Sequence, residues 1–328
     1  MLFDADTIVD RRRMRRKLTF WRVFAALLAI GAVLALAAAL RAPGTDLLTG
    51  APGSSIARVS ITGLIRSDRE RVEALERLGN SSTKGVIVHI NSPGGTTAGS
   101  EELHDSLKRL NEKKPMVVVV DGLAASGGYI AALSADHIVA QETSLVGSIG
   151  VLFQYPNVSE ALKTLGIQVE EIKSSPLKAA PNGFEPTSPQ ARAAIEAIVM
   201  DSYAWFRDLV KNGRHLDDAM LQQVADGRVF TGRQGVALQL VDELGDEQTA
   251  IAWLAKEKNV DPKTPVRDFE LRDRFSDLPF LHTAVIAALD AVGLRSIARQ
   301  IEDWGTVRAI DRLNLDGLLA LWHPSAAD

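Results

Sequence analysis

The chain has 328 residues, of which 46% are hydrophobic and 24% are charged. These values are typical of folded proteins and exclude wholesale disorder and fibrous repeats. The absence of cysteine excludes disulfides, thiolate zinc sites and a cysteine nucleophile. The formal net charge of −4 argues against a nucleic-acid partner. The length predicts about two domains, or one large domain with appendages.

The N-terminal region predicts a membrane anchor. Residues 1–22 carry seven Lys or Arg against three Asp, and residues 23–40 carry no charge. A helix over 23–40 would be about 27 Å long, close to the roughly 30 Å of a bilayer core. A cleaved signal peptide usually has a shorter apolar region, so we expect a retained transmembrane helix. The positive-inside rule then puts 1–22 in the cytoplasm and the rest, beginning with a flexible linker at 41–55, in the periplasm of a two-membrane bacterium.

From residue 56 the pattern becomes α/β. Short β-branched runs alternate with amphipathic segments, which predicts a mostly parallel sheet with helices on both faces. A long predicted helix at 189–212 has Ser188 as its N-cap and Pro189 in its first turn. Residues 260–328 are expected to form a C-terminal helical extension that includes an apolar helix at 281–298. The predicted strands are 56–61, 86–90, 116–120, 137–140 and 169–172. The predicted helices before residue 259 are 69–79, 100–110 and 189–212.

Two glycine-rich turns follow predicted strands, at residues 91–95 (NSPGG) and 121–129 (DGLAASGGY). In α/β folds such turns hold functional sites, and the N–H groups at the start of the next helix can hold an anion. Neither turn has the pattern of a nucleotide cradle. Ser126 lies in the second turn between small residues that leave its hydroxyl accessible. It is either a small residue that the turn requires or a nucleophile.

A serine nucleophile needs a base. A Ser-His-Asp triad stays open, because triads assemble in space rather than in sequence. The alternative is a lysine whose pKa is lowered by burial. Lys178 lies in an apolar segment without acidic neighbours, whereas Lys163 and Lys173 lie near glutamates. The histidines available for a triad are His89, His104 and His137.

Five motifs in a fixed order carry a family resemblance over roughly residues 56–259. Together they resemble the signal peptide peptidase A family, serine peptidase family S49, in its short single-domain form. The resemblance implies a Clp-protease/crotonase-like fold and a membrane-anchored, ATP-independent serine endopeptidase that needs neither a cofactor nor a metal. The motifs are residues 91–95 (NSPGG), 124–129 (AASGGY), 147–150 (GSIG), the lysine segment at 178, and 226–232 (DGRVFTG).

The resemblance also implies roles for individual residues. Ser126 matches the nucleophile and Lys178 the general base of a Ser-Lys dyad. Gly95 and the backbone N–H of Ser126 match the oxyanion hole, and Ser148 matches a serine that orients the lysine. The chain has serines at 174–175 where the family often has glycine.

In the family, short protomers form a homo-oligomeric ring in which the lysine can come from a neighbouring subunit. Family substrates are signal-peptide remnants left in the membrane after secretion. Two alternatives stay open: a Ser-Lys peptidase that cuts another membrane protein, and a catalytically silent scaffold of the same fold. An acyl-CoA enzyme is disfavoured, because CoA is cytoplasmic and the predicted domain faces outward.

Overall fold

The computed structural model divides the chain into two compact units, Met1–Gly53 and Ser54–Asp328. Within the first unit only Trp21 and Arg22 are described, and both are helical. The predicted anchor at 23–40 therefore lies outside the described residues. None of the helices in the described part of the chain is both long and apolar enough to cross a bilayer. The structure describes residues 21–22, 55–271 and 319–321.

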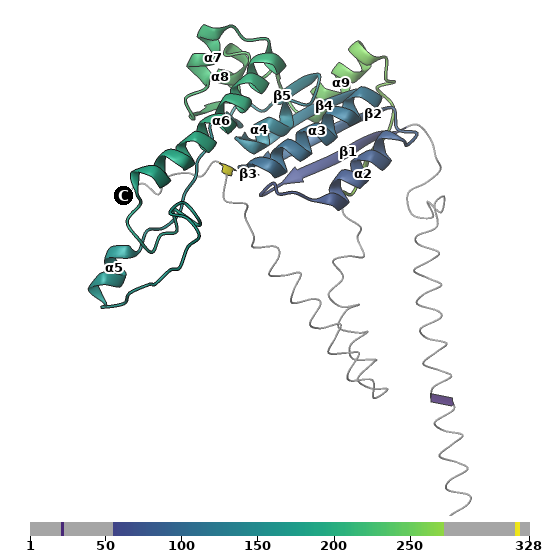
Figure 1. The fold of residues 1–328 in the computed structure, drawn as a ribbon. Coiled ribbons are helices and arrows are strands. Elements are labelled where there is room, and N and C mark those ends of the chain that lie inside the picture. Colours follow the sequence, from purple (N-terminus) through teal and green to yellow (C-terminus); the bar gives the residue numbers. More distant parts are fainter. Residues whose placement is uncertain (1–20, 23–54, 272–318, 322–328) are drawn as a thin grey trace, which may run out of the picture. The chain divides into compact units, whose positions relative to one another are not determined.

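An eight-stranded sheet forms the centre of the second unit (Figure 1). The strand order is β7-β6-β4-β2-β1-β9, with β5 beside β4 and β8 beside β5. All pairs are parallel except β6 with β7, which confirms the predicted mostly parallel sheet. The strands are β1 (Ile56–Thr62), β2 (Gly85–Ser92), β4 (Met116–Ala125), β5 (His137–Ala140), β6 (Leu145–Gly147), β7 (Val229–Thr231), β8 (Glu243–Leu244) and β9 (Val266–Asp268).

Helices cover both faces of this sheet, and each face has its own hydrophobic core. The larger core joins the sheet to α2, α3, α4, α6 and α7, and the smaller one joins it to α9. Five consecutive residues at the start of β4, Met116–Val120, are buried because both faces are covered. The helices are α2 (Arg69–Gly79), α3 (Thr97–Lys113), α4 (Gly127–Ala132), α5 (Ser159–Thr164), α6 (Pro189–Arg214), α7 (Asp218–Val224), α8 (Gly232–Ala237) and α9 (Glu247–Lys258).

A second, two-stranded sheet lies beside the first. Its strand β3 (Gly94–Thr96) follows β2 directly and pairs antiparallel with β10 (Leu319–Leu321). The other edge of β3 forms an isolated parallel bridge through Gly95 to Ile65. The first glycine-rich turn therefore contains a short strand of its own before α3 begins.

Most predicted elements are confirmed, and one is wrong. The cap of α6 is as predicted, because the Ser188 side chain accepts the Ala191 N–H at 3.1 Å. The predicted strand at 169–172 is wrong: these residues lie in an exposed stretch without regular structure. Val169 and Ile172 are exposed, and residues 169–172 pair with no strand among the residues that the structure describes. The sheet also continues past residue 259 through β9, inside the segment expected to be a helical extension.

Candidate active site

Ser126 is the single residue between β4 and α4, in a sharp turn of the backbone. Its φ is +53° and its ψ is −117°. A non-glycine residue in such a conformation stores about 1–3 kcal/mol of strain and persists only where its surroundings enforce it. Ser126 is buried, and its Oγ has no hydrogen-bond partner in the part of the chain that the structure describes. A strained, buried serine with an unpartnered hydroxyl is the arrangement expected of a nucleophile rather than of a structural turn residue.

Backbone contacts hold this turn in place. The Ser126 N–H donates to Gly147 O at 2.8 Å, and the Ser126 carbonyl accepts the N–H groups of Tyr129 and Ile130, each at 2.9 Å. Gly128 lets α4 approach the end of β2, because a Cβ on Gly128 would lie 2.6 Å from Ser92 O. The two glycine-rich turns of the sequence are therefore in direct contact.

Gly95 presents its N–H to the outer edge of β3. The Ile65 N–H donates to Gly94 O, and the Thr96 N–H donates to Ile65 O, both at 2.9 Å. Because backbone groups alternate along a strand, the N–H and C=O of Gly95 face the opposite edge. A Cβ on Gly95 would lie 1.7 Å from Ile65 O, so only glycine fits at this position. The N–H of Gly95, the predicted oxyanion donor, thus points away from Ile65, the residue that holds β3 in place.

The second predicted donor is differently placed. The Ser126 N–H is already bonded to Gly147 O, which is the β4–β6 ladder continued by one residue. In this structure it does not point toward a reacting carbonyl. Gly127 is the first residue of α4, and the first N–H groups of a helix have no partner within the helix. The Gly127 N–H is therefore the better donor beside Ser126.

Ser148 lies near Ser126, because its neighbour Gly147 accepts the Ser126 N–H through its carbonyl oxygen. Ser148 has a φ of +52°, is buried, and donates its N–H to Arg228 O at 2.8 Å. The antiparallel pairing of β6 with β7 places Gly147 opposite Val229. The third and fifth sequence motifs therefore meet beside Ser126, and the lysine-orienting role of Ser148 stays a prediction.

Lys178 is not brought to Ser126 within this chain. It is exposed, its N–H donates to Ser175 O at 3.1 Å, and Ser126 Oγ has no partner from it. Lys178 belongs to residues 151–188, which we call the arm; the arm contains α5 and extends from the sheet (Figure 1).

Lys173, also on the arm, is tied to two carboxylates. Its Nζ lies 2.5 Å from Glu171 and 2.7 Å from Glu185. Hydrogen bonds to these two groups raise the pKa of Lys173. A lysine held in its charged form cannot accept a proton, so Lys173 is unsuited to act as a base.

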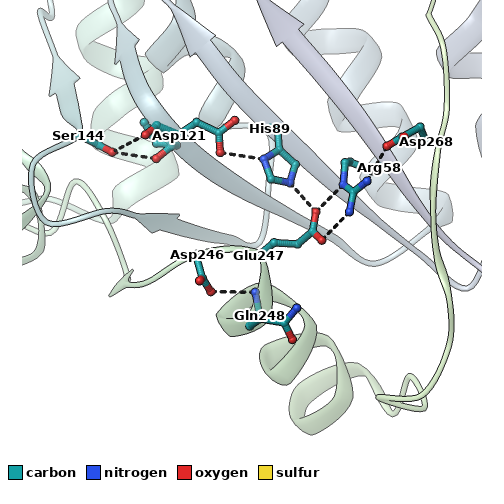
Figure 2. Close-up of polar contacts among 9 residues, drawn as sticks. Arg58, His89, Asp121, Ser144, Asp246, Glu247, Gln248 and Asp268 are labelled. Carbon is teal, nitrogen blue, oxygen red and sulfur yellow. Dashed lines mark hydrogen bonds and ion pairs between the residues drawn. The ribbon is translucent and has the colours of Figure 1, made fainter.

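The three candidate histidines are engaged elsewhere. Figure 2 shows His89 between Asp121, at 2.8 Å, and Glu247, at 2.9 Å. His104 is buried on α3, where desolvation lowers its pKa, and His137 stacks on Trp253 with ring centroids 4.8 Å apart. Since Ser126 Oγ has no partner in the described residues, none of these imidazoles is hydrogen-bonded to it. The structure gives no support to a Ser-His-Asp triad.

The His89 cluster fastens α9 to the sheet. The Glu247 carboxylate at the start of α9 accepts two hydrogen bonds from Arg58, at 2.5 and 2.7 Å, and Arg58 also contacts Asp268 at 2.6 Å. Hydrogen bonding to Arg58, and secondarily to His89, lowers the pKa of Glu247 against the opposing effect of burial. Sequence reasoning missed this cluster, because its members come from β1, β2, β4, α9 and β9. Among the described residues no group of three or more His, Asp or Glu is placed to hold a metal ion.

A strained serine at the junction of a strand and a helix in a mostly parallel α/β sheet is an arrangement typical of serine hydrolases. The comparisons with known proteins make the class specific. The sequence profile of peptidase family S49 matches residues 108–261, and that of Clp protease matches residues 66–145. The chain belongs to peptidase family S49, has a Clp-protease-like α/β fold and is a serine peptidase.

Several similar proteins are described as proteases. A Synechocystis sp. protein assigned as a protease is 36% identical over 63% of this chain and 76% of its own length. An Enterococcus faecium protein assigned as the signal peptide peptidase SppA is 30% identical over 66% of this chain and 67% of its own length. Protease 4 of Haemophilus influenzae is 29% identical over 66% of this chain and 37% of its own length. Among solved structures, ClpP1 from Listeria monocytogenes is 16% identical and covers 58% of this chain and 91% of its own, with a TM-score of 0.37.

Proposed function

We propose that this chain is a membrane-anchored, ATP-independent endopeptidase with a Ser126–Lys178 dyad that degrades signal-peptide remnants. The observation that carries the proposal is the strained, buried Ser126 with an unpartnered Oγ at the start of α4, a helix that contacts β3, the strand of Gly95. Lys178 is assigned by the family resemblance and by elimination. His89 and Lys173 are paired with carboxylates, and Ser126 Oγ has no hydrogen-bond partner among the described residues, so another residue has to act as its base.

In the proposed reaction, Lys178 in its uncharged form takes the proton of Ser126 Oγ, which attacks a peptide carbonyl. The negative charge that develops on the carbonyl oxygen is stabilised by the N–H groups of Gly95 and Gly127. Loss of one such donor typically costs about 10²–10³ in rate. Lys178 then protonates the departing amine. The same lysine next takes a proton from water, which attacks the acyl group, and returns this proton to Ser126 Oγ as the acyl group leaves. Ser148 orients the lysine in this scheme.

The proposed dyad forms between neighbouring copies in a homo-oligomeric ring. Two features support this. Lys178 is exposed within one chain, and the arm that carries it has large apolar side chains in solvent, which a second copy would cover. Shielding from water in that interface also favours the uncharged lysine that the reaction needs. The exposed apolar residues of the arm include Leu165, Ile167, Val169, Ile172, Leu177 and Phe184.

The proposed location is the inner membrane, with a single span at 23–40 and the peptidase unit in the periplasm. Support comes from the basic block at 1–22 and the uncharged run that follows. An anchor in the same chain keeps the peptidase at the membrane in which the apolar peptides remain. The small residues around Ser126 suit small or apolar substrate side chains.

The test is a pair of substitutions in the full-length protein in detergent. Ser126→Ala and Lys178→Ala should each abolish hydrolysis of a synthetic signal peptide, while Lys163→Ala, an exposed lysine of the same arm, should keep it. A fluorophosphonate should label wild type and not Ser126→Ala. Full activity of either dyad variant would refute the dyad. Absence of both hydrolysis and labelling in wild type would favour a silent scaffold, and cleavage of an intact membrane protein instead of the signal peptide would favour the other alternative.

A further inference from the structure

A segment from the far end of the chain occupies the outer edge of β3. Residues 319–321 form β10, which runs antiparallel to β3 with Ala320 opposite Gly95 (Figure 1, yellow beside β3). β3 is the strand that carries the proposed oxyanion donor. The edge that a substrate backbone would have to use is therefore already paired.

The register puts Ala320 at the position that a substrate residue would take. The N–H and C=O of Gly95 face away from Ile65, because Gly94 O and the Thr96 N–H bond to Ile65 on the other edge. In an antiparallel ladder, opposite residues whose backbone groups face each other form the hydrogen-bonded type of pair. Gly95 and Ala320 form such a pair. The backbone of Ala320 therefore competes directly for the Gly95 N–H.

We propose that residues 319–321 are an internal competitor that binds the β3 edge as an extended peptide and restrains the peptidase until substrate displaces it. The proposal rests on the proposed function of Ser126 and Gly95. Addition of a strand to an exposed sheet edge is a general mode of peptide recognition, in which backbone hydrogen bonds give the affinity. The segment is Leu-Ala-Leu, free of charge and of proline, and thus has the composition of an apolar extended peptide.

The competitor is tethered, and its pairing is short. Residues 269–318 connect it to the end of β9, so binding is intramolecular and governed by an effective concentration. Three paired residues leave the contact weak enough for a longer substrate to displace it. The segment would thus raise the substrate concentration needed for activity without blocking the site permanently.

The test uses substitutions at position 320 in the full-length protein. Ala320→Pro removes the backbone N–H and disrupts pairing, and Ala320→Ser is the matched control that keeps the N–H. We expect Ala320→Pro to accelerate fluorophosphonate labelling of Ser126 by about tenfold, as release of a tethered competitor should. Ala320→Ser should label like wild type. Equal labelling rates for all three proteins, with unchanged thermal unfolding, would overturn the proposal and leave the nucleophile assignment intact.

A second measurement does not depend on the nucleophile. A fluorescent synthetic peptide with the sequence of residues 313–322 is titrated into Ser126→Ala protein with and without Ala320→Pro. We expect binding about tenfold tighter when Ala320→Pro frees the edge. Equal affinity for the two proteins would overturn the proposal. If no protein labels with fluorophosphonate, the proposed function fails, and this titration alone decides whether the β3 edge binds the segment.

Discussion

At Ser126 the backbone adopts a conformation that glycine would adopt more easily. The φ of +53° places a Cβ in a sterically unfavourable region, so the fold stores strain at the hydroxyl it presents. The strain is enforced by the bond from the Ser126 N–H to Gly147 O and by the start of α4. The backbone strain that positions the Ser126 hydroxyl therefore lowers the stability of the folded chain.

The strain makes a stability prediction. Ser126→Gly should unfold at a higher temperature than Ser126→Ala, although both lack the hydroxyl. Relief of about 1–3 kcal/mol of strain exceeds the roughly 0.5–1 kcal/mol that the flexibility of glycine costs. Thermal unfolding in detergent measures the difference, and Ala132→Gly in the last turn of α4 should be destabilising as a control. Ser126→Gly that unfolds below Ser126→Ala would show that the turn is not strained.

The contact between the two glycine-rich turns makes another prediction. Gly128→Ala should lower peptidase activity by at least about tenfold, because its Cβ would lie 2.6 Å from Ser92 O and displace the nucleophile turn. Gly122→Ala lies in the same stretch of chain, but its Cβ would meet Asn91 at an ordinary 3.5 Å. Gly122→Ala should therefore be nearly neutral. Steady-state kinetics of the two variants separate a steric effect from a general sensitivity of the segment.

Among the elements, α9 is held on the sheet by an apolar face and by the ionic cluster around Glu247. Ala250 and Leu254 are its buried residues, and Glu247 binds Arg58 and His89 (Figure 2). The two ring nitrogens of His89 lie within hydrogen-bond distance of two carboxylates, Asp121 and Glu247, so His89 links α9 to the end of β4.

The cluster predicts how stability depends on pH. The pKa of Glu247 is lowered below its ordinary value of 4.5, so its stabilising contribution is present above that value and is lost as pH falls through the lowered pKa. Glu247→Gln should lose about 1–2 kcal/mol at neutral pH, because the partly exposed carboxylate accepts charge-assisted bonds. Its thermal stability should also fall less steeply between neutral pH and pH 3. Glu73→Gln, which removes an exposed pair with Arg69, is the control, and identical pH profiles for wild type and Glu247→Gln would contradict the account.

Local patterns sufficed to predict most elements near the site and failed for those that depend on distant partners. The helix at 69–79 and the strand at 137–140 have the predicted bounds, because hydrophobic periodicity fixes them. The predicted strand at 169–172 (VEEI) pairs with none of the strands in the described part of the chain. Conversely, β10 could not be predicted, since its three residues become a strand only by pairing with β3.

For the whole molecule, the order of the motifs was readable from sequence, but their contacts were not. The pairing of β4 with β6 and of β6 with β7 brings residues 124–129, 147–150 and 226–232 together around Ser126. Because the Ser126 N–H donates to Gly147 O, we propose the Gly127 N–H as the oxyanion donor in its place. This change could be inferred only from the backbone hydrogen bonds. The assignment of Lys178 stays a prediction, because the arm that carries it leaves Ser126 Oγ without a partner in a single copy.

The most direct test of the account mixes two inactive proteins. Ser126→Ala keeps the lysine, and Lys178→Ala keeps the nucleophile, so a dyad formed between neighbouring copies can be rebuilt only in mixed assemblies. The two proteins are dissociated, combined, reassembled in detergent and assayed on a synthetic signal peptide, with each protein alone as the control. The account predicts that hydrolysis returns in the mixture and is absent from each protein alone. A mixture as inactive as its components, under conditions where reassembled wild type is active, would contradict it.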